Sequence, residues 1–523
     1  MHEIELKFQV PTGQRAAVDS AVAGRTPQRR VHLQAAYFDT AQRALAQAKL
    51  ALRVRREGRR WVQTLKGATD DGMTRLEHNV VLGAGSEPPQ ADPALHAGTP
   101  VGDRLFAVLR DSASDRESAP LTALYRTDIL RRTRVQRSAL GSVELAFDTG
   151  WITAGESKLA VHELEIELLG GSPQAVIATA RRWVPRFGLW LDTRSKSERG
   201  DLLSRGEAIA TPRGALSVRL APGMNAAEAL RCVLEKCADQ IFANASQIAS
   251  GEHADEHVHQ LRVGLRRLRS ALQLFDGTPA GSGPQPAPDS ALRSTLENAA
   301  ATLFRRLGAA RDEAVIEADF TTDLLAALRA AGVSGDGPRA TASGAEEAPA
   351  TVLREAASQG LLLDLLAATQ AAAVTDPRAN PRADPRVDPH EEPPLRGQLA
   401  ARLNRWHRRA AADAKRYREL DDAGRHRLRK HVKRLRYALE FSASLFRPRK
   451  VRPYLAALRA AQERLGAIND VVVAMEAFKR TRDTDPRAWF ALGWLAARRE
   501  VLIAKALPDL KKFAAAKRFW KKD

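Results

Sequence analysis

Cysteine is scarce in this 523-residue chain, because Cys232 and Cys237 are the only two. They stand five residues apart in a segment of helical spacing and so point to different faces, which suits neither a disulfide nor a metal site. A chain with so few thiols fits a reducing compartment, and we expect a cytoplasmic protein.

Long apolar runs and aromatic side chains are also scarce. No stretch of about 18 apolar residues occurs, so we expect no membrane span. The chain opens on a strand pattern rather than on a charged and then apolar leader, so we expect no signal peptide. Aromatic residues make up 5% of the chain, which leaves few rings to stack on nucleic-acid bases.

Acidic residues are outnumbered, with 62 Asp and Glu against 82 Lys and Arg, for a net charge of +20. The default partner is therefore a polyanion: polyphosphate, nucleic acid or an acidic membrane surface. No nucleic-acid motif is found, so nucleic acid ranks behind polyphosphate. The length predicts two to four domains, and an apolar content of 44% is ample for their cores.

The first residues alternate between apolar and polar side chains, with Glu3, Glu5, Lys7 and Gln9 on one face, which is the signature of a strand. Residues 161–168 repeat the pattern with Glu163, Glu165 and Glu167 in a row. Carboxylates in a row repel one another, so such a row makes sense where a divalent cation neutralises it. The alternative is a strand whose charged face lies in water.

Residues 1 to about 205 are strand-rich, and nearly every strand has one apolar face and one charged face. Some charged faces are acidic and others are basic. An open sheet leaves these faces in water, whereas a wide antiparallel barrel encloses them in a polar tunnel. Acids that hold metal and bases that hold an anion are together the apparatus of phosphoryl transfer.

The motif Glu3-x-Glu5-x-Lys7 resembles the ExExK signature of the CYTH superfamily, the triphosphate tunnel metalloenzymes. Seven further pieces occur in that family's order: Tyr37-Phe38-Asp39-Thr40, Leu52-Arg53-x-Arg55, Thr64-Leu65-Lys66, Arg75-x-Glu77, Glu144-x-x-x-Asp148, Glu163-x-Glu165-x-Glu167 and Ser195-Lys196-x-x-Arg199-Gly200. The resemblance covers residues 1 to about 205.

This resemblance implies an eight-stranded antiparallel tunnel that cleaves triphosphates with Mg2+ or Mn2+ by attack of water, without a nucleophilic Ser or Cys. The metal ligands that it implies are Glu3, Glu5, Asp148, Glu163, Glu165 and Glu167. The triphosphate-binding residues that it implies are Lys7, Arg53, Arg55, Lys66, Arg75, Lys196 and one of Arg126 and Arg131. Strand parity lets only one of those two arginines face inward easily, and the choice stays open here.

Within that set, the catalytic residues that we predict are Glu3, Glu5, Lys7, Lys66 and Arg75. Two neighbouring residues receive other roles. Glu77 is expected to pair with Arg75 or Lys66 across strands, and Tyr37 is expected to fix a strand end.

The rest of the chain is helical in spacing and contains an internal repeat. Residues 256–275 and 426–441 align, and a second match follows each copy, at Leu307-Gly308-Ala309 and Leu465-Gly466-Ala467. The duplication predicts a helical bundle with two-fold pseudo-symmetry. Its copies are expected at about residues 225–330 and 395–520, with flexible insertions at about 276–290, 331–349 and 375–394, which are rich in Gly, Pro or small polar residues.

Each copy carries a basic stripe, because positions i, i+3, i+7 and i+10 share one side of a helix. The stripes consist of His259, Arg262, Arg266 and Arg269 in the first copy and of His426, Arg429, Lys433 and Arg436 in the second. For one helix a solvated basic face is an equal alternative, but the duplication favours binding.

This half resembles the CHAD domain, the conserved-histidine α-helical domain, over about residues 215–520. The ligand that the resemblance implies is inorganic polyphosphate, which Arg, Lys and His bind by charge and hydrogen bonds. Metal binding by the histidines ranks second, because no carboxylate or Cys ligand stands at the usual spacing.

Together these patterns predict an α+β multidomain protein: an eight-stranded antiparallel β tunnel with flanking helices at residues 1–205, a linker at 206–220 and an all-α domain at 221–523. The leading function is an inorganic triphosphatase with an attached polyphosphate-binding module, in the cytoplasm or at polyphosphate granules. The alternatives are hydrolysis of thiamine triphosphate or a nucleoside triphosphate, cyclisation of ATP, and a non-catalytic polyphosphate scaffold. The oligomeric state stays open.

Overall fold

The structure is a computed structural model that describes residues 4–24, 29–68, 75–85, 88–112, 120–277, 290–333, 335–338, 347–370 and 395–520, without the side chains of residues 68, 75 and 309–319. The chain divides into two compact units. The first consists of Met1–Arg213, Phe242–Ala254 and Leu353–Val374, and the second of the remaining residues. The first unit thus includes two segments from the helical part of the sequence. The domain boundaries expected from the sequence stay a prediction.

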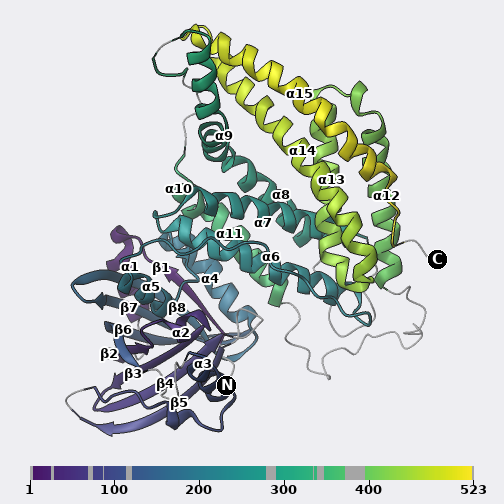
Figure 1. The fold of residues 1–523 in the computed structure, drawn as a ribbon. Coiled ribbons are helices and arrows are strands. Elements are labelled where there is room, and N and C mark those ends of the chain that lie inside the picture. Colours follow the sequence, from purple (N-terminus) through teal and green to yellow (C-terminus); the bar gives the residue numbers. More distant parts are fainter. Residues whose placement is uncertain are drawn as a thin grey trace. The chain divides into compact units, whose positions relative to one another are not determined.

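The first unit is built on one antiparallel sheet (Figure 1). Its strands are β1 (Glu5–Gln9), β2 (Arg29–Asp39), β3 (Leu50–Glu57), β4 (Arg60–Ala68), β5 (Arg75–Ala84), β6 (Thr122–Ser138), β7 (Gly141–Ala154), β8 (Ser157–Gly171) and the two-residue β9 (Trp190–Leu191). Their hydrogen-bonded order is β5-β4-β3-β2-β6-β7-β8-β1-β9. Chain neighbours pair by hairpins from β3 to β5 and from β6 to β8, whereas β1 joins the sheet beside β8.

Alternation along the strands gives the sheet an outer face that packs most of its apolar core and an inner face that carries most of the charges of the candidate site, beside a smaller apolar cluster. The outer face packs against α1 (Arg15–Ala23), α3 (Pro100–Asp111) and α4 (Gln174–Phe187). Leu52, Val54 and Leu65 are fully buried there with Leu105 of α3. The shorter elements of this unit are η1 (Thr12–Gln14), α2 (Ala44–Gln47), η2 (Pro93–His96) and α5 (Lys196–Ser204).

Segments distant in sequence complete the first unit. Helix α11 (Ala356–Gln370) packs against α4, where Arg181 Nη2 lies 2.6 Å from Asp364 Oδ1. The backbone N–H of Leu191 in β9 donates to Gln359 Oε1 at 2.8 Å. The backbone N–H of Thr193 donates to Ser246 Oγ at 3.0 Å.

The second unit is helical. Its elements are α6 (Ala226–Ala249), α7 (Asp255–Leu274), α8 (Ser290–Arg306), α9 (Gly308–Ala330), α10 (Pro349–Arg354), α12 (Leu395–Lys415), η3 (Tyr417–Glu419), α13 (Asp422–Ser442), η4 (Ala443–Leu445), α14 (Pro448–Thr481) and α15 (Arg487–Ala515). The last residues of α6 and α10 belong to the first unit. Helices α14 and α15 lie side by side as a long hairpin (Figure 1). The repeated helices α7 and α13 also contact each other.

This arrangement, an antiparallel sheet followed by a helical part, confirms the predicted α+β fold class. The predicted insertion at 375–394 lies outside the described residues, as do 278–289 of the insertion at 276–290 and residues 334 and 339–346 of the insertion at 331–349. Within the described ranges, no helix is long and apolar enough to cross a membrane.

Candidate functional site: an acidic cluster and a basic wall on one sheet face

The inner face of the sheet collects most of the charged residues that the sequence singled out. The cross-strand register pairs Arg131 with Asp148, Asp148 with Glu163, and Lys7 with Glu165. On the other half of the sheet, Tyr37 pairs with Arg53, and Lys66 pairs with Glu77. Paired residues in an antiparallel sheet share a face. The inner face therefore combines carboxylates on β7 and β8 with cations on β3 and β4.

The centre of the acidic half is a buried cluster of Asp148, Glu163 and Glu165, which we call the acidic cluster. One carboxylate oxygen from each residue lies within 4.8 Å of the others. Lys196 Nζ lies 2.6 Å from Asp148 Oδ2 and 2.9 Å from Glu165 Oε1, and it also contacts Glu163. The ammonium group thus contacts all three carboxylates at once.

Two arginines complete the charge balance of the acidic cluster. Arg131 donates two parallel hydrogen bonds to Asp148, at 2.7 Å from Nε to Oδ1 and 2.6 Å from Nη2 to Oδ2. It also contacts Glu165. Arg199 contacts Glu163. Three carboxylates therefore face three cations, which is how buried charges are tolerated in a protein interior.

These contacts shift the pKa values of Glu165 and Lys196. Burial alone raises the pKa of Glu165, but the neighbouring Arg131, Lys196 and Lys7 outweigh it and hold the pKa well below its usual range. Burial alone lowers the pKa of Lys196, and the three carboxylates reverse this and raise it. Glu165 and Lys196 are therefore both charged at neutral pH.

The acidic cluster fits a divalent cation. Its donors are carboxylate oxygens, the ligands that Mg2+, Mn2+ and Ca2+ prefer. The Lys196 ammonium stands in for a positive ion, because it already lies within hydrogen-bonding distance of all three side chains. Among the residues that the structure describes, this is the only group of three or more potential metal ligands.

The basic half of the inner face consists of Arg53, Arg55 and Lys66. Lys66 Nζ lies 2.7 Å from Glu77 Oε2. Burial raises the pKa of Glu77, but Lys66 outweighs it and the pKa falls to about 2. The expected pairing of Glu77 with Lys66 is thus present. Arg55 Nε donates to Glu57 Oε1 at 2.9 Å.

The structure separates the two arginines that the sequence left as alternatives. Arg131 lies on the inner face against the acidic cluster, whereas Arg126 is exposed on the opposite face, in register with Ala36. Arg126 and Arg131 are five positions apart on β6, an odd number, so their side chains point to opposite faces.

Other predicted residues lie at the margins of the site or outside the description. Glu5 projects from the inner face and contacts Lys7, and Glu167 pairs with Glu5 across β1 and β8. Glu3 lies outside the described residues, as does the side chain of Arg75.

Two residues of the inner face had received no binding role. Arg199 stands one turn after Lys196 on α5, so both side chains reach the same carboxylates, and helical spacing could have revealed it. Tyr37 is buried and stacks on Tyr125 with ring centroids 4.8 Å apart. Burial raises the pKa of Tyr37, but the hydrogen-bonded Arg53 outweighs it and lowers the pKa.

Local sequence explains why α5 begins where it presents Lys196. Ser195 caps the helix, because its Oγ accepts from the backbone N–H of Glu198 at 3.1 Å while the Glu198 carboxylate accepts from the N–H of Ser195 at 2.7 Å. Gly200 lets the helix approach the sheet, since a Cβ there would lie 2.3 Å from the Tyr125 ring.

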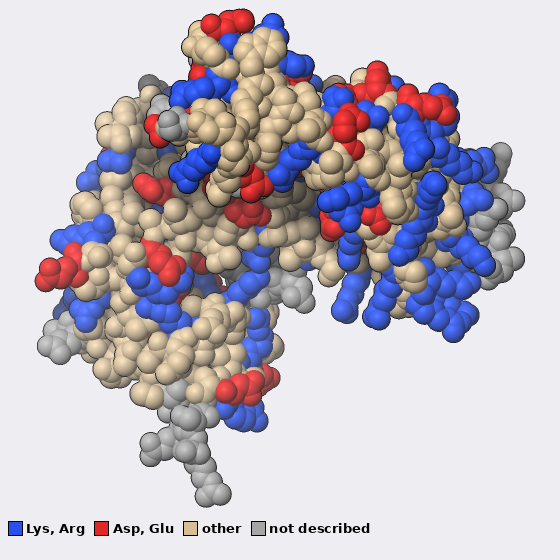
Figure 2. Space-filling view, turned by 45° about the horizontal axis from the view of Figure 1, so that its top comes forward, with Lys and Arg blue, Asp and Glu red and all other residues tan. Residues whose placement is uncertain are grey.

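A second candidate site lies on the helical unit, where α7 and α13 carry the two basic stripes. Figure 2 shows Lys and Arg gathered on the visible face of the helical part, at the right of the view. Arg262 and Arg266 lie over the Phe304 ring at 4.3 and 5.3 Å from its centroid. His426 Nδ1 lies 2.9 Å from Asn469 Oδ1.

The two stripes meet at Lys433. Burial lowers the pKa of Lys433 to about 5, together with repulsion from Arg266 of the first stripe and from Arg429 and Arg436 of its own, and Asp470 only partly opposes this. Lys433 is therefore largely neutral at pH 7. Neither His259 nor His426 belongs to a group of three potential metal ligands in the described part of the chain.

The remaining members of the stripes have partial acidic partners. Arg269 Nη2 and Glu297 Oε1 are 4.0 Å apart, as are Arg429 Nη2 and Asp470 Oδ1. Arg436 Nη1 lies 3.2 Å from Glu440 Oε1. The five arginines of the stripes outnumber these three carboxylates, so the stripes keep a net positive charge.

Fold and site together define the class of protein: a β domain with an acid-and-base inner face, joined in one chain to a helical domain with paired basic stripes. Comparison with known families names both parts. Residues 1–199 match the CYTH domain and residues 232–479 match the CHAD domain. The chain therefore carries a CYTH domain followed by a CHAD domain, which confirms the resemblance seen in the sequence.

Individual relatives are more distant. An inorganic triphosphatase from Haemophilus influenzae is 28% identical over 167 residues, which are 32% of this chain and 44% of that protein. This chain thus matches less than half the length of that relative. Among solved structures, the CHAD domain from Ricinus communis is 28% identical with a TM-score of 0.44, covering 59% of this chain and 98% of its own. A Hippeastrum protein described as having a dominant triphosphatase activity is 17% identical with a TM-score of 0.28, covering 39% and 97%.

Proposed function

We propose that the protein is a divalent-metal-dependent hydrolase that cleaves inorganic triphosphate to diphosphate and phosphate, and that its CHAD domain binds polyphosphate. The observation that carries the proposal is the buried acidic cluster on the same sheet face as Arg53, Arg55 and Lys66. A pure phosphate binder has no need of these carboxylates, because they engage Lys196, Arg131 and Arg199, which could otherwise bind phosphate. This favours an enzyme over a non-catalytic scaffold.

In the proposed reaction, Asp148, Glu163 and Glu165 hold Mg2+ or Mn2+, with Glu3, Glu5 and Glu167 as further ligands. The bound ion supplies Lewis-acid polarisation of the phosphate and an activated water.

Arg53, Arg55 and Lys66 hold the non-bridging phosphate oxygens, together with Lys7, Arg75, Arg131 and Lys196. The oxygen of water bonds to the terminal phosphorus, the bond from that phosphorus to the leaving diphosphate breaks, and the proton that the water loses passes to a product phosphate oxygen or to solvent. Charge that builds on the leaving diphosphate falls on cations already fixed in place, so little reorganisation is needed.

Inorganic triphosphate is the substrate of choice for two reasons. The curated relative that matches the CYTH half is an inorganic triphosphatase. The attached CHAD domain, whose stripes suit a linear polyanion, favours a substrate without an organic end. Thiamine triphosphate and ATP are the comparison substrates.

The test uses the parity of β6, which supplies a matched pair. Arg131→Gln removes a cation that contacts two carboxylates of the acidic cluster, whereas Arg126→Gln removes the same charge from the outer face. We expect Arg131→Gln to lower kcat/KM for inorganic triphosphate by about 100-fold or more, because an electrostatic contact at a reacting centre contributes that much.

Arg126→Gln should keep the parental rate. Phosphate release by the folded variants, monitored beside their thermal melting, makes the comparison. Equal losses in both variants would mean that the reaction does not take place on the inner face.

A further inference from the structure

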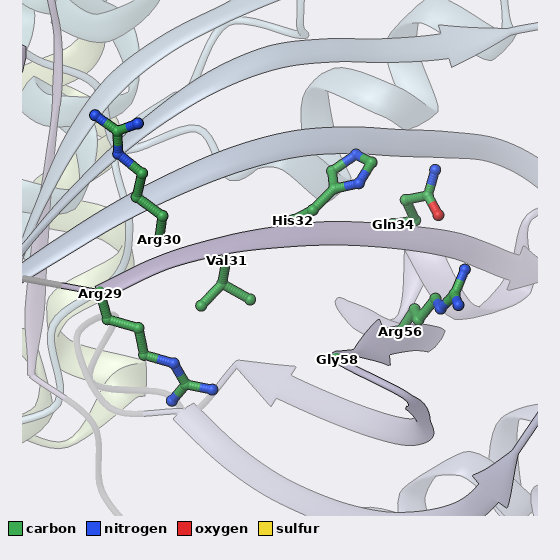
Figure 3. Close-up of a pocket in the computed structure, with 7 residues that line it drawn as sticks. All are labelled: Arg29, Arg30, Val31, His32, Gln34, Arg56 and Gly58. Carbon is green, nitrogen blue, oxygen red and sulfur yellow. The ribbon is translucent and has the colours of Figure 1, made fainter.

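A pocket outside the inner-face site opens beside the first residues of β2. Strand β2 pairs with β6 from Arg29 onward but with β3 only from Leu33, because β3 ends at Glu57 and the chain turns at Gly58. Four residues of β2 therefore extend past the β3–β4 hairpin. The pocket occupies this step and has a volume of about 410 Å³ (Figure 3).

The lining of the pocket is mostly basic and polar: Arg29, Arg30, His32, Gln34 and Arg56, beside Val31 and Gly58. Figure 3 shows the side chains of Arg30, His32 and Gln34 on one side of β2 and those of Arg29 and Val31 on the other. No Phe, Tyr or Trp belongs to the lining. The pocket therefore offers charge and hydrogen-bond donors but no ring on which a nucleobase could stack.

The acidic residues next to the pocket are already engaged. Asp128 lies 2.6 Å from His32 Nε2 and accepts a hydrogen bond from Gln34 Nε2 at 3.0 Å. Glu57 accepts from Arg55.

The guanidinium groups of the pocket, in contrast, have no acidic partner among the residues that the structure describes. Within the described part of the chain, Arg29, Arg30 and Arg56 form no ion pair with a carboxylate, and Arg56 Nε is buried without a hydrogen-bond partner. Arg29 and Arg30 are exposed and Arg56 is half-buried, so three positive charges without a described ion-pair partner line one cavity.

An anion resolves this imbalance. Guanidinium groups bind phosphate oxygens with two parallel N–H donors, which is stronger and more directional than a single contact. The volume lies in the range of small-ligand sites, and it exceeds the needs of a single chloride. At Gly58, no atom lies within 4 Å of the position that a Cβ would take, so this wall of the cavity is open.

We propose that this pocket is a further, non-catalytic binding site for an inorganic condensed phosphate of diphosphate or triphosphate size. The site holds its ligand through Arg29, Arg30 and Arg56, with Gln34 and His32 as hydrogen-bonding side chains. None of the lining residues belongs to the acidic cluster or to the group of Arg53, Arg55 and Lys66, so the inference stands whether or not that site hydrolyses triphosphate.

The test measures diphosphate binding to the full chain by titration calorimetry in EDTA, where no metal-dependent turnover takes place. The pocket variant combines Arg29→Gln, Arg30→Gln and Arg56→Gln. The control variant combines Arg110→Gln, Arg137→Gln and Arg182→Gln, which removes the same charge from exposed positions elsewhere in the CYTH half. We expect the pocket variant to lose one binding event, or to weaken it by about ten-fold or more, since each charged hydrogen bond contributes about that factor.

Location is tested by chemical protection. Phenylglyoxal modifies accessible arginines, and peptide mass spectrometry should show that diphosphate protects Arg29, Arg30 and Arg56 but not the three control arginines. Overlapping isotherms for the two variants, or equal labelling with and without diphosphate, would overturn the proposal. Hydrolysis of triphosphate with Mn2+ by the pocket variant should match that of the parent, which separates this proposal from the proposed function.

Discussion

At the scale of single residues, Lys196 decides the charge of the acidic cluster. Its ammonium contacts Asp148, Glu163 and Glu165, where a divalent cation would be expected to lie. Lys196 and a metal ion therefore compete for the same oxygens. The sequence assigned Lys196 to the triphosphate, and only the structure brings it against the three carboxylates.

Lys196→Met should destabilise the metal-free protein by about 3–5 kcal/mol, because removing one partner leaves buried carboxylates uncompensated. Added Mn2+ should raise the unfolding temperature of this variant more than that of the parent, since the ion binds the vacated oxygens of the native state. Differential scanning calorimetry with and without Mn2+ checks both effects, and the exposed Lys158→Met is the control. An equal Mn2+ shift in parent and variant would contradict the competition.

The second prediction for a single residue concerns the protonation of Lys433 and rests on the proposed polyphosphate binding. The charges that act on it are those of Arg266 on α7, Arg429 and Arg436 on α13, and Asp470 on α14. With a pKa of about 5, Lys433 is mostly unprotonated at pH 7, and a bound polyanion favours its protonated form. Binding should therefore take up as much as about one proton, and affinity should fall as pH rises from 6 to 8.

Titration calorimetry of polyphosphate in buffers of different ionisation enthalpy measures this proton uptake. Lys433→Arg keeps a cation that stays protonated, so its uptake should be smaller and its affinity less dependent on pH. The same uptake in both proteins would assign the proton to another group, such as His426, whose pKa burial also lowers.

At the scale of elements, α5 is the part that turns a charged sheet into a site. It begins at Lys196 behind the Ser195 cap and passes Tyr125 so closely that position 200 has no room for a Cβ. A change from Gly to Ala should therefore lower the stability at Gly200, where packing decides, and raise it at Gly360, where helix propensity decides.

Gly200→Ala should destabilise the protein and lower triphosphate hydrolysis, because the new Cβ pushes α5 away from Tyr125. Gly360→Ala, in the middle of α11 with no atom within 4 Å of its Cβ position, should stabilise by about 0.5–1 kcal/mol from helix propensity alone. Thermal melting and phosphate release measure both. If Gly200→Ala stabilised the protein and kept full activity, that would contradict the close packing of α5 against Tyr125.

The strands were the most predictable elements. Strict alternation in residues 2–10 and 161–168 predicted β1 and β8 and the face that their carboxylates share, and the structure pairs Lys7 with Glu165 as that face requires. Alternation within one strand does not fix which face turns inward. The choice between Arg126 and Arg131 therefore needed the register of β6 against β2 and β7, which passes a bulge at Tyr37 and Phe38.

At the scale of the whole molecule, the β domain is not made of one continuous stretch of sequence. Phe242–Ala254 and Leu353–Val374 cluster with it, through contacts such as those of Gln359 with Leu191 and of Ser246 with Thr193. A single sequence shows helical spacing in these segments but carries no sign of their distant partners. Alternation in the first part of the chain and helical spacing in the rest, in contrast, were enough to predict the α+β fold class and the basic stripes of the helical part.

A fragment that ends at residue 205 should therefore be less stable than the same domain in the full chain. It would expose the surface of α4 that packs on α11 and leave the Leu191 and Thr193 N–H groups without their side-chain acceptors. Thermal inactivation of triphosphate hydrolysis compares the two proteins, with the full chain inactivating at the higher temperature. Identical inactivation temperatures would mean that the two helical segments add nothing to the stability of the CYTH domain.

Phosphate release from inorganic triphosphate by the intact protein, with Mg2+ or Mn2+ and with EDTA, tests the proposed chemistry most directly. The parent should release phosphate only with metal, Glu165→Gln should lose nearly all of this activity while remaining folded, and Glu156→Gln, on an exposed turn, should keep it. Release that persists in EDTA or in Glu165→Gln, or no release from triphosphate, ATP or thiamine triphosphate, would contradict a metal-dependent triphosphatase on the inner face. A polyphosphate-binding scaffold would then be the better reading of the chain.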